Sequence, residues 1–392
     1  MQQRLVRVLV ALTVLAPFLV GIRPASSAPT PRSFTIAAAG DVLIHGRVAQ
    51  VAHIGGGAYD FSPMFSAIAP WVAAADLAIC HLEVTLSPTN TGLQFYPRFV
   101  APHEVADAVA GAGYDTCSIA SNHALDRGWQ GVVDTLDLLD AAGVRHDGTA
   151  RTPEERLPGL YEVNGATVAH LSYTYGTNGI PLPTDRPYAV NVIDPEMILG
   201  DATWARAAGA DFVIVSLQWG LEYFVGPTGT QTALAEVLMA SPDIDLILGS
   251  HAHIVQPIGM VDGKYVVYGM GNQVSNQNSA SGPKYYATED GLFVMVRVTE
   301  TSPGRFEVER IDIVPTWVRR SDYLILPARQ QVEDDRTSAL MQASLERTVD
   351  RVRRLDAPGI RLAPAIPPGP PCHCLLAPWD GRARLDLAPL VN

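Results

Sequence analysis

From residue 33 onward, apolar residues fall in short runs that alternate with stretches in which they recur at helical spacing. The short runs predict strands and the longer stretches predict helices. We expect a first strand at 34–39 and a second strand that ends near residue 83. Further strands are expected at 116–120, 167–173, 212–217, 244–249, 265–268, 291–298 and 306–314. Helices are expected at 103–112 and 131–142, because each stretch is closed by a glycine that suits a helix terminus. This alternation predicts an α/β sandwich, and the closely spaced late strands add an antiparallel component.

The C-terminal part of the sequence changes character twice. Residues 339–355 place Met341, Leu345, Val349 and Val352 at helical spacing and predict an amphipathic helix. Residues 357–371 contain six prolines, a density that no helix or central strand tolerates, so we expect an extended tail. The predicted organisation after the N-terminal segment is one domain over 33–326, a helical segment over 327–356 and a Pro-rich tail over 357–392.

The first residues of the chain have the layout of an export signal. Arg4 and Arg7 precede an uncharged, mostly apolar stretch over residues 8–22, and small residues at 26–28 suit a cleavage site. The apolar stretch is shorter than the ~20 residues of a membrane-spanning helix. We therefore predict that residues 1–28 are a signal peptide and that the protein is secreted or extracytoplasmic, in the cell envelope. An uncleaved N-terminal anchor is the alternative.

Composition and charge narrow the function classes. The 392 residues are 47% hydrophobic, which provides the apolar material for a core and excludes a disordered chain. The formal net charge is −12, and it becomes −15 when residues 1–28, with three arginines and no acidic residue, are removed. The sequence contains no run of Lys or Arg, so we expect no nucleic-acid partner.

Four cysteines are too few for a disulfide scaffold in a chain of this length. Export permits disulfides, but Cys80 and Cys117 lie in apolar, strand-like runs, and we expect two buried thiols there. Cys372 and Cys374 flank His373 in the Pro-rich tail. A bond between these two cysteines is compatible with the sequence, whereas a structural metal site would need more ligands than this triplet supplies.

Residues able to bind a metal ion follow four separate predicted strands: Asp41, Glu83, the pair Asn122 and His123, and the pair His251 and His253. Because loops at the carboxyl ends of strands in an open α/β sheet converge on one crevice, we expect these side chains to lie together. Carboxylate, amide and imidazole groups suit a divalent transition metal. Each residue alone fits a cap or a hydrogen-bonded polar group, but the coincidence of four favours a metal site. In extended backbone, His251 and His253 would point the same way.

Several of these residues lie in blocks with a recognisable order. The main blocks are 40–41 (Gly-Asp), 82–83 (Leu-Glu), 121–128 (Ser-Asn-His-Ala-Leu-Asp-Arg-Gly), 219–223 (Trp-Gly-Leu-Glu-Tyr) and 249–253 (Gly-Ser-His-Ala-His), with further blocks at 173–179 and 268–272. Together they resemble the CapA family of capsule or poly-γ-glutamate biosynthesis proteins, from about residue 34 to about 326. The resemblance implies an α/β fold, a calcineurin-like metallophosphatase sandwich of two mixed β-sheets flanked by helices.

The resemblance also implies roles for individual residues. The metal ligands would be Asp41, Glu83, Asn122, His251 and His253. Glu83 would take the place of the bridging Asp of phosphatase relatives. His123 would protonate a leaving oxygen or steady the transition state, and Asp126 would orient its imidazole. A helix cap before Gly128 is the equal alternative for Asp126.

The sequence departs from the family pattern at two positions. Gln218 stands where the family usually has a His ligand before Trp-Gly, and its carbonyl oxygen is a weaker, harder ligand than imidazole. Occupancy of a second metal is therefore in doubt. His81 stands where the family more often has Asn, and it is expected either to replace part of the missing imidazole or to be a hydrogen-bonded neighbour of the ligands. His45 fits either a ligand or a turn residue bonded to backbone.

The resemblance implies a metal-dependent hydrolase of phosphoester or γ-glutamyl amide bonds, with one or two divalent ions (Mn, Zn, Fe or Mg). The substrate would be a cell-surface polymer or a small phosphoester or peptide, and membrane-associated synthesis machinery would be a partner. Arg98, Tyr175 and Asn178 fit either substrate contacts or loop structure. Two other functions stay open: a non-catalytic assembly or binding protein with a degraded metal site, and a secreted nucleotidase-like phosphatase.

Overall fold

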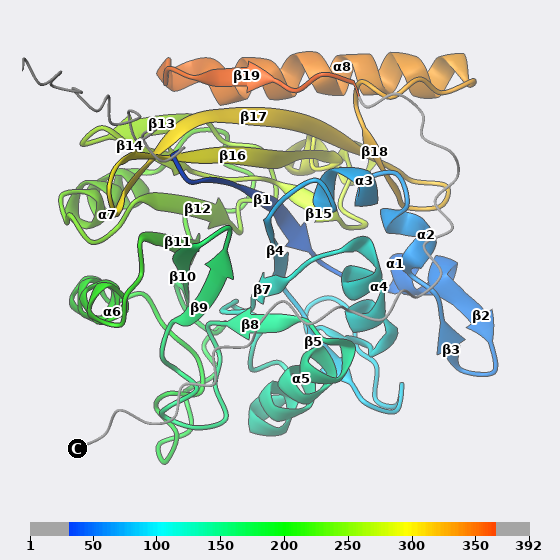
Figure 1. The fold of residues 1–392 in the computed structure, drawn as a ribbon. Coiled ribbons are helices and arrows are strands. Elements are labelled where there is room, and N and C mark those ends of the chain that lie inside the picture. The colour runs from blue at the N-terminus through cyan, green and yellow to red at the C-terminus, as the bar shows by residue number, and fades with distance from the viewer. Residues whose placement is uncertain (1–30, 366–392) are drawn as a thin grey trace, which may run out of the picture. The chain divides into compact units, whose positions relative to one another are not determined.

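The computed structural model describes residues 31–365. The predicted signal peptide over 1–28 and residues 366–392, with Cys372 and Cys374, lie outside the described residues. Within the described part, helices and strands form four layers, with α6 and α7 on one side, α1 to α5 on the other and two β-sheets between them (Figure 1). The expected sandwich of two mixed sheets flanked by helices is therefore confirmed.

The first sheet has nine strands and joins both ends of the described chain. Its main path runs β18 (Leu324–Pro327), β17 (Arg305–Arg319), β16 (Asp290–Ser302), β1 (Ser33–Val42), β4 (Leu77–Leu82), β7 (Thr116–Ser118) and β8 (Arg145–Asp147), while β15 (Asn272–Val274) pairs with β1 and β19 (Ile360–Leu362) with β17. Strands β1, β4, β7 and β8 are parallel, whereas the pairs β1–β16, β16–β17 and β17–β18 are antiparallel.

The second sheet has six strands with a parallel centre. Their order is β13 (Ile258–Val261), β14 (Lys264–Val267), β12 (Leu246–Ser250), β11 (Phe212–Gln218), β10 (Ala166–Thr174) and β9 (Gly159–Val163). The two edge strands are antiparallel to their neighbours. Two small ribbons, β2 (His53–Gly55) with β3 (Ala58–Tyr59) and β5 (Thr85–Ser87) with β6 (Val100–Pro102), lie outside the main sheets.

Alternating apolar residues explain how the layers form. In β1, Phe34, Ile36 and Ala38 face the second sheet and join one core, whereas Ala37 and Ala39 face the helices and join another. This is the two-residue period of a strand that is buried on both faces. The helices on the first sheet are α1 (Gly46–Ala52), α2 (Ser62–Phe65), α3 (Ala69–Val72), α4 (Glu104–Ala112) and α5 (Gly128–Ala142), and those on the second are α6 (Pro195–Ala207) and α7 (Gly229–Met239).

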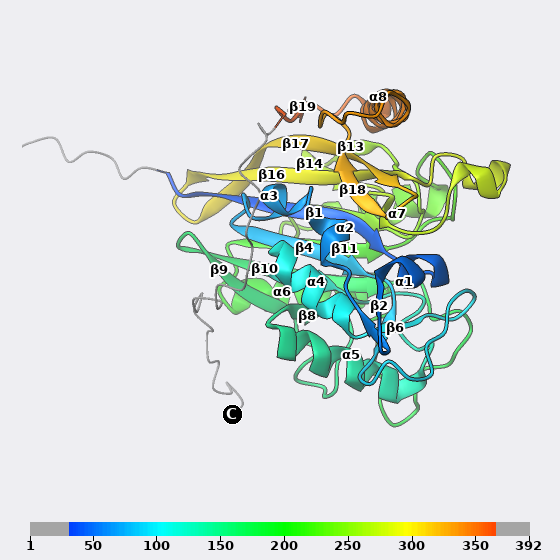
Figure 2. The same cartoon turned by 90° about the vertical axis from the view of Figure 1, so that its right-hand side faces the viewer.

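The last helix begins earlier than its apolar spacing indicated. Helix α8 spans Asp335–Val352 because Asp334 caps it, accepting a hydrogen bond from the Thr337 backbone N–H at 2.6 Å. The short 3-10 helix η3 (Arg353–Leu355) continues it. Helix α8 packs over β17 and β16 (Figure 2). After it, the predicted extended tail contributes β19 at the edge of the first sheet. Within residues 31–365, none of the helices is long and apolar enough to cross a membrane.

The expectation of two buried thiols at Cys80 and Cys117 is wrong. The two residues are direct partners in the parallel pair of β4 and β7, with their Cα atoms 4.4 Å apart, and they form a disulfide. Side chains of registered partners point to the same face of a sheet, which brings the two sulfur atoms together. The sequence placed each cysteine in a strand but did not indicate that these strands are neighbours.

Candidate metal centre

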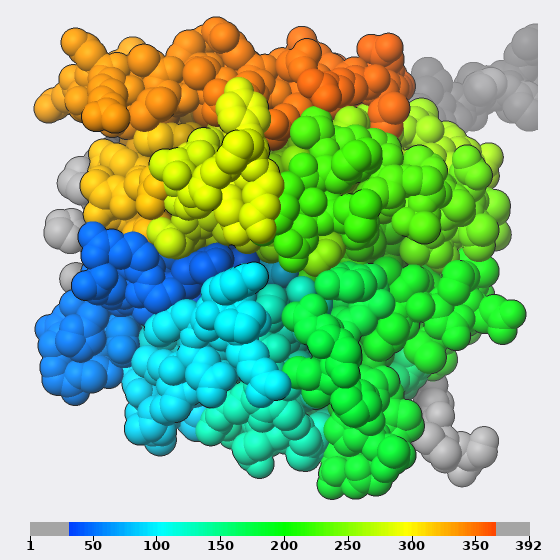
Figure 3. Space-filling view, turned by 180° about the vertical axis from the view of Figure 1, so that it is seen from behind, coloured from blue at the N-terminus to red at the C-terminus, as the bar shows by residue number. Residues whose placement is uncertain are grey.

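The predicted site residues meet where strands of both sheets end. Asp41 lies near the end of β1, Glu83 follows β4, Gln218 ends β11 and His251 follows β12. Gly40 permits a close approach here, because a Cβ atom at this position would lie 1.8 Å from the carbonyl oxygen of Gly271. Figure 3 shows the molecule from behind, where blue, cyan, green and yellow segments of the chain meet on one face.

Asp41 and His253 are hydrogen-bonded to each other, and both are buried. Nδ1 of His253 lies 2.9 Å from Oδ2 of Asp41 and 3.8 Å from Oε2 of Glu83. Burial disfavours the ionised form of Asp41, but the hydrogen bond and charge of His253 outweigh it and hold the pKa of Asp41 below its ordinary value. Burial raises the pKa of Glu83 well above its ordinary value, although His253 opposes this shift.

Gln218 joins Glu83 to Asn122 by hydrogen bonds. Its Nε2 donates to Oε1 of Glu83 at 2.9 Å and to Oδ1 of Asn122 at 2.7 Å. Its Oε1 accepts from the Asn122 backbone N–H at 2.9 Å and from the Thr174 hydroxyl at 2.6 Å. The predicted ligand Gln218 is thus brought into the cluster, but its oxygen points at protein donors and its nitrogen at the predicted ligands.

His81 reaches the cluster from β4. Its Nδ1 lies 3.2 Å from the Ser118 hydroxyl, and its Nε2 faces Asp41 at 4.0 Å from Oδ1. His81 is therefore on the Asp41 side of the site and not beside Gln218.

Three buried atoms in this cluster have no hydrogen-bond partner among the described residues: Nε2 of His81, Oε2 of Glu83 and Nδ1 of His251. A buried polar atom without a partner is costly and requires an explanation. Two triads each bring one ligand atom per residue within 4.8 Å of one another, Asp41–His81–Glu83 and Glu83–His251–His253. The donor set and its unpaired atoms therefore fit a divalent cation.

The backbone that presents the two C-terminal histidines is not extended. His251 has a φ of 87° and His253 a φ of 56°, so both residues are in the left-handed region. The expectation that extended backbone aligns their side chains is wrong. The turn still directs both imidazoles to Glu83. Burial lowers the pKa of His251 to about 3, and this keeps its imidazole neutral.

His123 and Asp126 form a second, adjacent unit. Nδ1 of His123 lies 2.6 Å from Oδ2 of Asp126, and the same carboxylate oxygen accepts the Phe99 backbone N–H at 2.6 Å. The Phe99 ring packs edge-on against the imidazole, with ring centroids 4.7 Å apart. Helix α5 has Arg127 at its N-cap and no side-chain cap, so Asp126 bonds to His123 and not to the helix end.

Two of the three residues predicted to contact substrate, Tyr175 and Asn178, lie beside residues of the cluster. Tyr175 is 45% exposed, and its ring centroid is 4.5 Å from that of His251. Oδ1 of Asn178 accepts a hydrogen bond from Nδ2 of Asn122 at 3.2 Å. Arg98 is exposed and directly precedes Phe99. His45 belongs to neither triad, because its Nδ1 lies among Leu43, Ser275 and Asn276 in a turn.

Two residues that the sequence did not single out also border the site. Oδ1 of Asn272 lies 3.1 Å from Nδ1 of His253, and the ring of Tyr223 lies 5.8 Å from that of His253. Both fall in blocks that carried the family resemblance, and this was the available signal for them.

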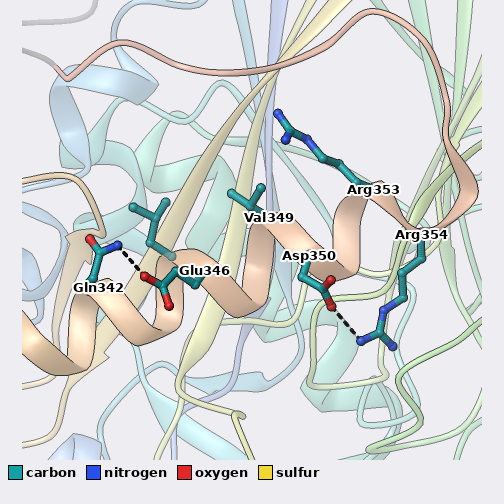
Figure 4. Close-up of a pocket in the computed structure, with 7 residues that line it drawn as sticks. Gln342, Glu346, Val349, Asp350, Arg353 and Arg354 are labelled. Carbon is teal, nitrogen blue, oxygen red and sulfur yellow. Dashed lines mark hydrogen bonds and ion pairs between the residues drawn. The ribbon is translucent and has the colours of Figure 1, made fainter.

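A hollow of about 550 Å³ lies away from this cluster, along α8 and η3 (Figure 4). Four of its polar side chains form two pairs: Gln342 donates to Glu346 at 2.8 Å, and Arg354 pairs with Asp350 at 2.8 Å. It contains none of the predicted site residues. The candidate site is therefore at the strand ends and not in this hollow.

Comparison with known proteins agrees with the sequence blocks. Residues 35–277, more than half of the chain, match the family model described as bacterial capsule synthesis protein PGA_cap. The chain belongs to this family. It is 33% identical over 200 residues to the PGA biosynthesis protein CapA of Bacillus subtilis, an alignment that covers 50% of each chain. It is 24% identical to the capsule biosynthesis protein CapA of Bacillus anthracis over 71% of this chain and 67% of the relative. The chain thus spans about half to two thirds of these relatives.

Solved structures whose backbones were matched to this chain have low sequence identity to it. The 5'-nucleotidase precursor of Thermus thermophilus is 15% identical, with a TM-score of 0.45 over 81% of this chain and 59% of that one. The calcineurin-like phosphoesterase YfkN of Bacillus subtilis is 14% identical, with a TM-score of 0.44 over 83% of this chain and all of that one.

Proposed function

We propose that this capsule synthesis family member is an exported, metal-dependent hydrolase that acts on a cell-surface polymer such as poly-γ-glutamate or on its precursors. The observation that carries the proposal is the group of unpaired, buried ligand atoms on His81, Glu83 and His251 beside the pair His123–Asp126. A structural role alone would not require ligand atoms without partners in a buried site. When bound, a divalent cation supplies Lewis acidity to such a site.

In this proposal His123 handles the proton. Asp126 accepts the Nδ1 hydrogen of His123, so Nε2 is the atom at which the imidazole gains or releases a proton. The Phe99 ring and the Phe99 backbone N–H hold the imidazole and the carboxylate in place. A proton donor fixed in this way serves a leaving oxygen or a leaving nitrogen, so both a phosphoester and a γ-glutamyl amide are suitable substrates.

Two exposed, positively charged side chains support the proposal that the substrate is an anion. Arg98 is exposed beside Phe99, and Nζ of Lys284 lies 5.8 Å from the ring centroid of Tyr223, which borders His253. These positive charges would offset the acidity of the whole chain where a polyanion or phosphoester enters. Export agrees with the disulfide Cys80–Cys117, because such bonds persist in oxidising compartments.

The test uses residues 29–392, purified and assayed with a phosphodiester, a phosphomonoester, a nucleotide and a γ-glutamyl peptide. We expect the protein to turn over at least one of these substrates. A chelator should abolish this activity and Mn²⁺ should restore it, and the variant His123→Asn should lack it. Preference for the nucleotide would favour a nucleotidase-like phosphatase. A protein that binds metal but turns over none of these substrates would contradict the hydrolase.

One observation favours the second candidate, a non-catalytic assembly protein. Every donor and acceptor of the Gln218 amide is used by the protein, as expected where a ligand position has been given up. In that case poly-γ-glutamate would bind to the purified protein in a pull-down assay, and the bound polymer would keep its length.

A further inference from the structure

The two departures from the family pattern lie on different sides of Glu83. His81 faces Asp41, with its Nε2 atom 4.0 Å from Oδ1 of the carboxylate. Gln218 contacts the other side, where its Nε2 donates to Oε1 of Glu83 and to Oδ1 of Asn122. The imidazole gained at position 81 therefore does not fill the position of Gln218. It adds a ligand atom to the Asp41 side of the centre.

The orientation of the Gln218 amide is fixed by a neighbouring group that can only donate a hydrogen bond. The Asn122 backbone N–H can only donate, so the atom it meets at 2.9 Å is the amide oxygen. The opposite atom, the NH₂ group, then points at the Glu83 carboxylate. An amide nitrogen that carries its hydrogens has no lone pair for a cation. Gln218 therefore presents donors, and no ligand atom, to Glu83 and Asn122.

The two carboxylate oxygens of Glu83 therefore have different surroundings. Oε1 is occupied by the Gln218 amide, while Oε2 has no hydrogen-bond partner and lies 3.8 Å from Nδ1 of His253. A carboxylate that binds two cations through separate oxygens needs both of them free. Here only Oε2 is without a hydrogen-bond partner, and it lies on the side of His253, which is bonded to Asp41.

The hydrogen-bond partners of His81 favour its role as a metal ligand. Ser118 lies 3.2 Å from Nδ1 of His81 and 2.8 Å from the hydroxyl of Ser172. In the tautomer in which Ser118 donates to Ser172 and accepts the Nδ1 hydrogen of His81, the Nε2 lone pair of His81 is directed at the cluster. The disulfide Cys80–Cys117 joins the residues directly before His81 and Ser118, so it holds the two strands in register at this point.

We propose that the centre binds one divalent cation through the triad Asp41–His81–Glu83, and that the Gln218 amide stands in place of a second cation between Glu83 and Asn122. This inference rests on the metal dependence in the proposed function and adds to it the number of ions and the identity of a ligand. His251, with its unpaired Nδ1, and Asn122 are then the remaining part of the second position.

Metal content separates this inference from the proposed function. Wild type, His81→Asn, Gln218→His and Gln218→Leu are dialysed against Mn²⁺ at a series of free concentrations, and bound metal per chain and the metal-induced rise in Tm are measured. The exposed His53→Ala is the control for loss of a histidine. We expect one ion in wild type, at least about tenfold weaker binding in His81→Asn, two ions in Gln218→His and one in Gln218→Leu.

Two ions in wild type, or unchanged affinity in His81→Asn, would overturn the inference and leave the metal dependence standing. A single ion in Gln218→His would overturn the part that concerns the amide. No bound ion in wild type would overturn both the inference and the proposed function. The Gln218 variants keep the test decisive if His81→Asn, which changes a buried residue, does not fold.

Discussion

The pair His123–Asp126 shows at the scale of single residues how geometry determines chemistry. The carboxylate oxygen that holds the imidazole also accepts a backbone N–H, so it is fixed by the loop that carries Phe99. Phe99 covers one edge of the ring. Such a buried pair fixes both the tautomer and the direction of the histidine, and each residue can be tested separately.

We expect His123→Asn to lower kcat by about 10²–10⁴-fold, because the proton donor is lost. Asp126→Asn keeps the imidazole but removes the carboxylate that orients it, so we expect a loss of about 10–100-fold. Neither residue belongs to the two ligand triads, so bound metal per chain should not change in either variant. Steady-state kinetics and metal analysis of the same samples test this. Loss of metal in His123→Asn would place this residue among the ligands instead.

The sequence predicted which residues meet in the cluster, but not which of their atoms contact one another. Strand ends bring Asp41, Glu83 and His251 together, and that rule is readable from an apolar run followed by a polar residue. Which oxygen of Glu83 meets Gln218, and which nitrogen of His81 faces Asp41, depend on rotamers and on strands far apart in the chain. These details required the structure.

At the scale of elements, a chain of polar side chains joins the two sheets. Asp147 in β8 accepts hydrogen bonds from the Gly159 backbone N–H at 2.7 Å, from the Tyr161 hydroxyl at 2.7 Å and from Nδ1 of His170 at 2.8 Å. The acceptor belongs to the first sheet and the three donors to β9 and β10 of the second. His170 continues the chain to Ser216 in β11 at 2.8 Å.

This buried carboxylate makes stability depend on pH. Burial opposes the charge of Asp147, but His170 and Tyr161 outweigh it and hold its pKa below the ordinary value of 3.8. A lowered pKa in the folded state means that the stabilisation is present above about pH 3.8 and is lost as pH falls through the folded pKa. We expect Asp147→Asn to reduce the free energy of unfolding by about 1–3 kcal/mol at pH 7, and by less at pH 3.

Urea denaturation at the two pH values measures this difference. Asp137→Asn, which removes a carboxylate that is 60% exposed, is the control and should change little. An equal loss for Asp147→Asn at both pH values would show that the charge of Asp147 has no part in joining the sheets.

Two helices on the second sheet had sequence signals that apolar spacing did not reveal. Helix α6 begins with Asp194 as N-cap and a proline in its first turn, and α7 begins with a capping box between Thr228 and Gln231. By contrast, no local signal could pair Cys80 with Cys117, because strand order is set by the packing of the whole sheet. Local capping chemistry was readable from the sequence, whereas the neighbours of each strand were not.

At the scale of the whole molecule, the disulfide and the proposed export are linked. The bond closes a separation of 37 residues and joins the two residues that directly precede His81 and Ser118. Loop-closure entropy for a loop of this size corresponds to about 3–4 kcal/mol. We expect the exported protein to contain a disulfide-linked peptide pair with Cys80 and Cys117, detected by mass spectrometry without reduction. Residues 29–392 made in a reducing cytosol should lack this bond and unfold at a lower Tm.

The double variant Cys80→Ala with Cys117→Ala is the control, because its Tm should not depend on the compartment of expression. Equal Tm values for wild type from both compartments, with both thiols free, would contradict the link between the disulfide and export.

In the proposed function, strand ends of both sheets form a divalent metal centre. Anomalous diffraction from crystals grown with Mn²⁺ would locate the ion. We expect an anomalous peak at about 2.0–2.3 Å from carboxylate oxygens of Asp41 and Glu83 and from at least one imidazole nitrogen of the triads. Crystals with manganese bound only at surface carboxylates, and no peak between Asp41 and Glu83, would contradict it.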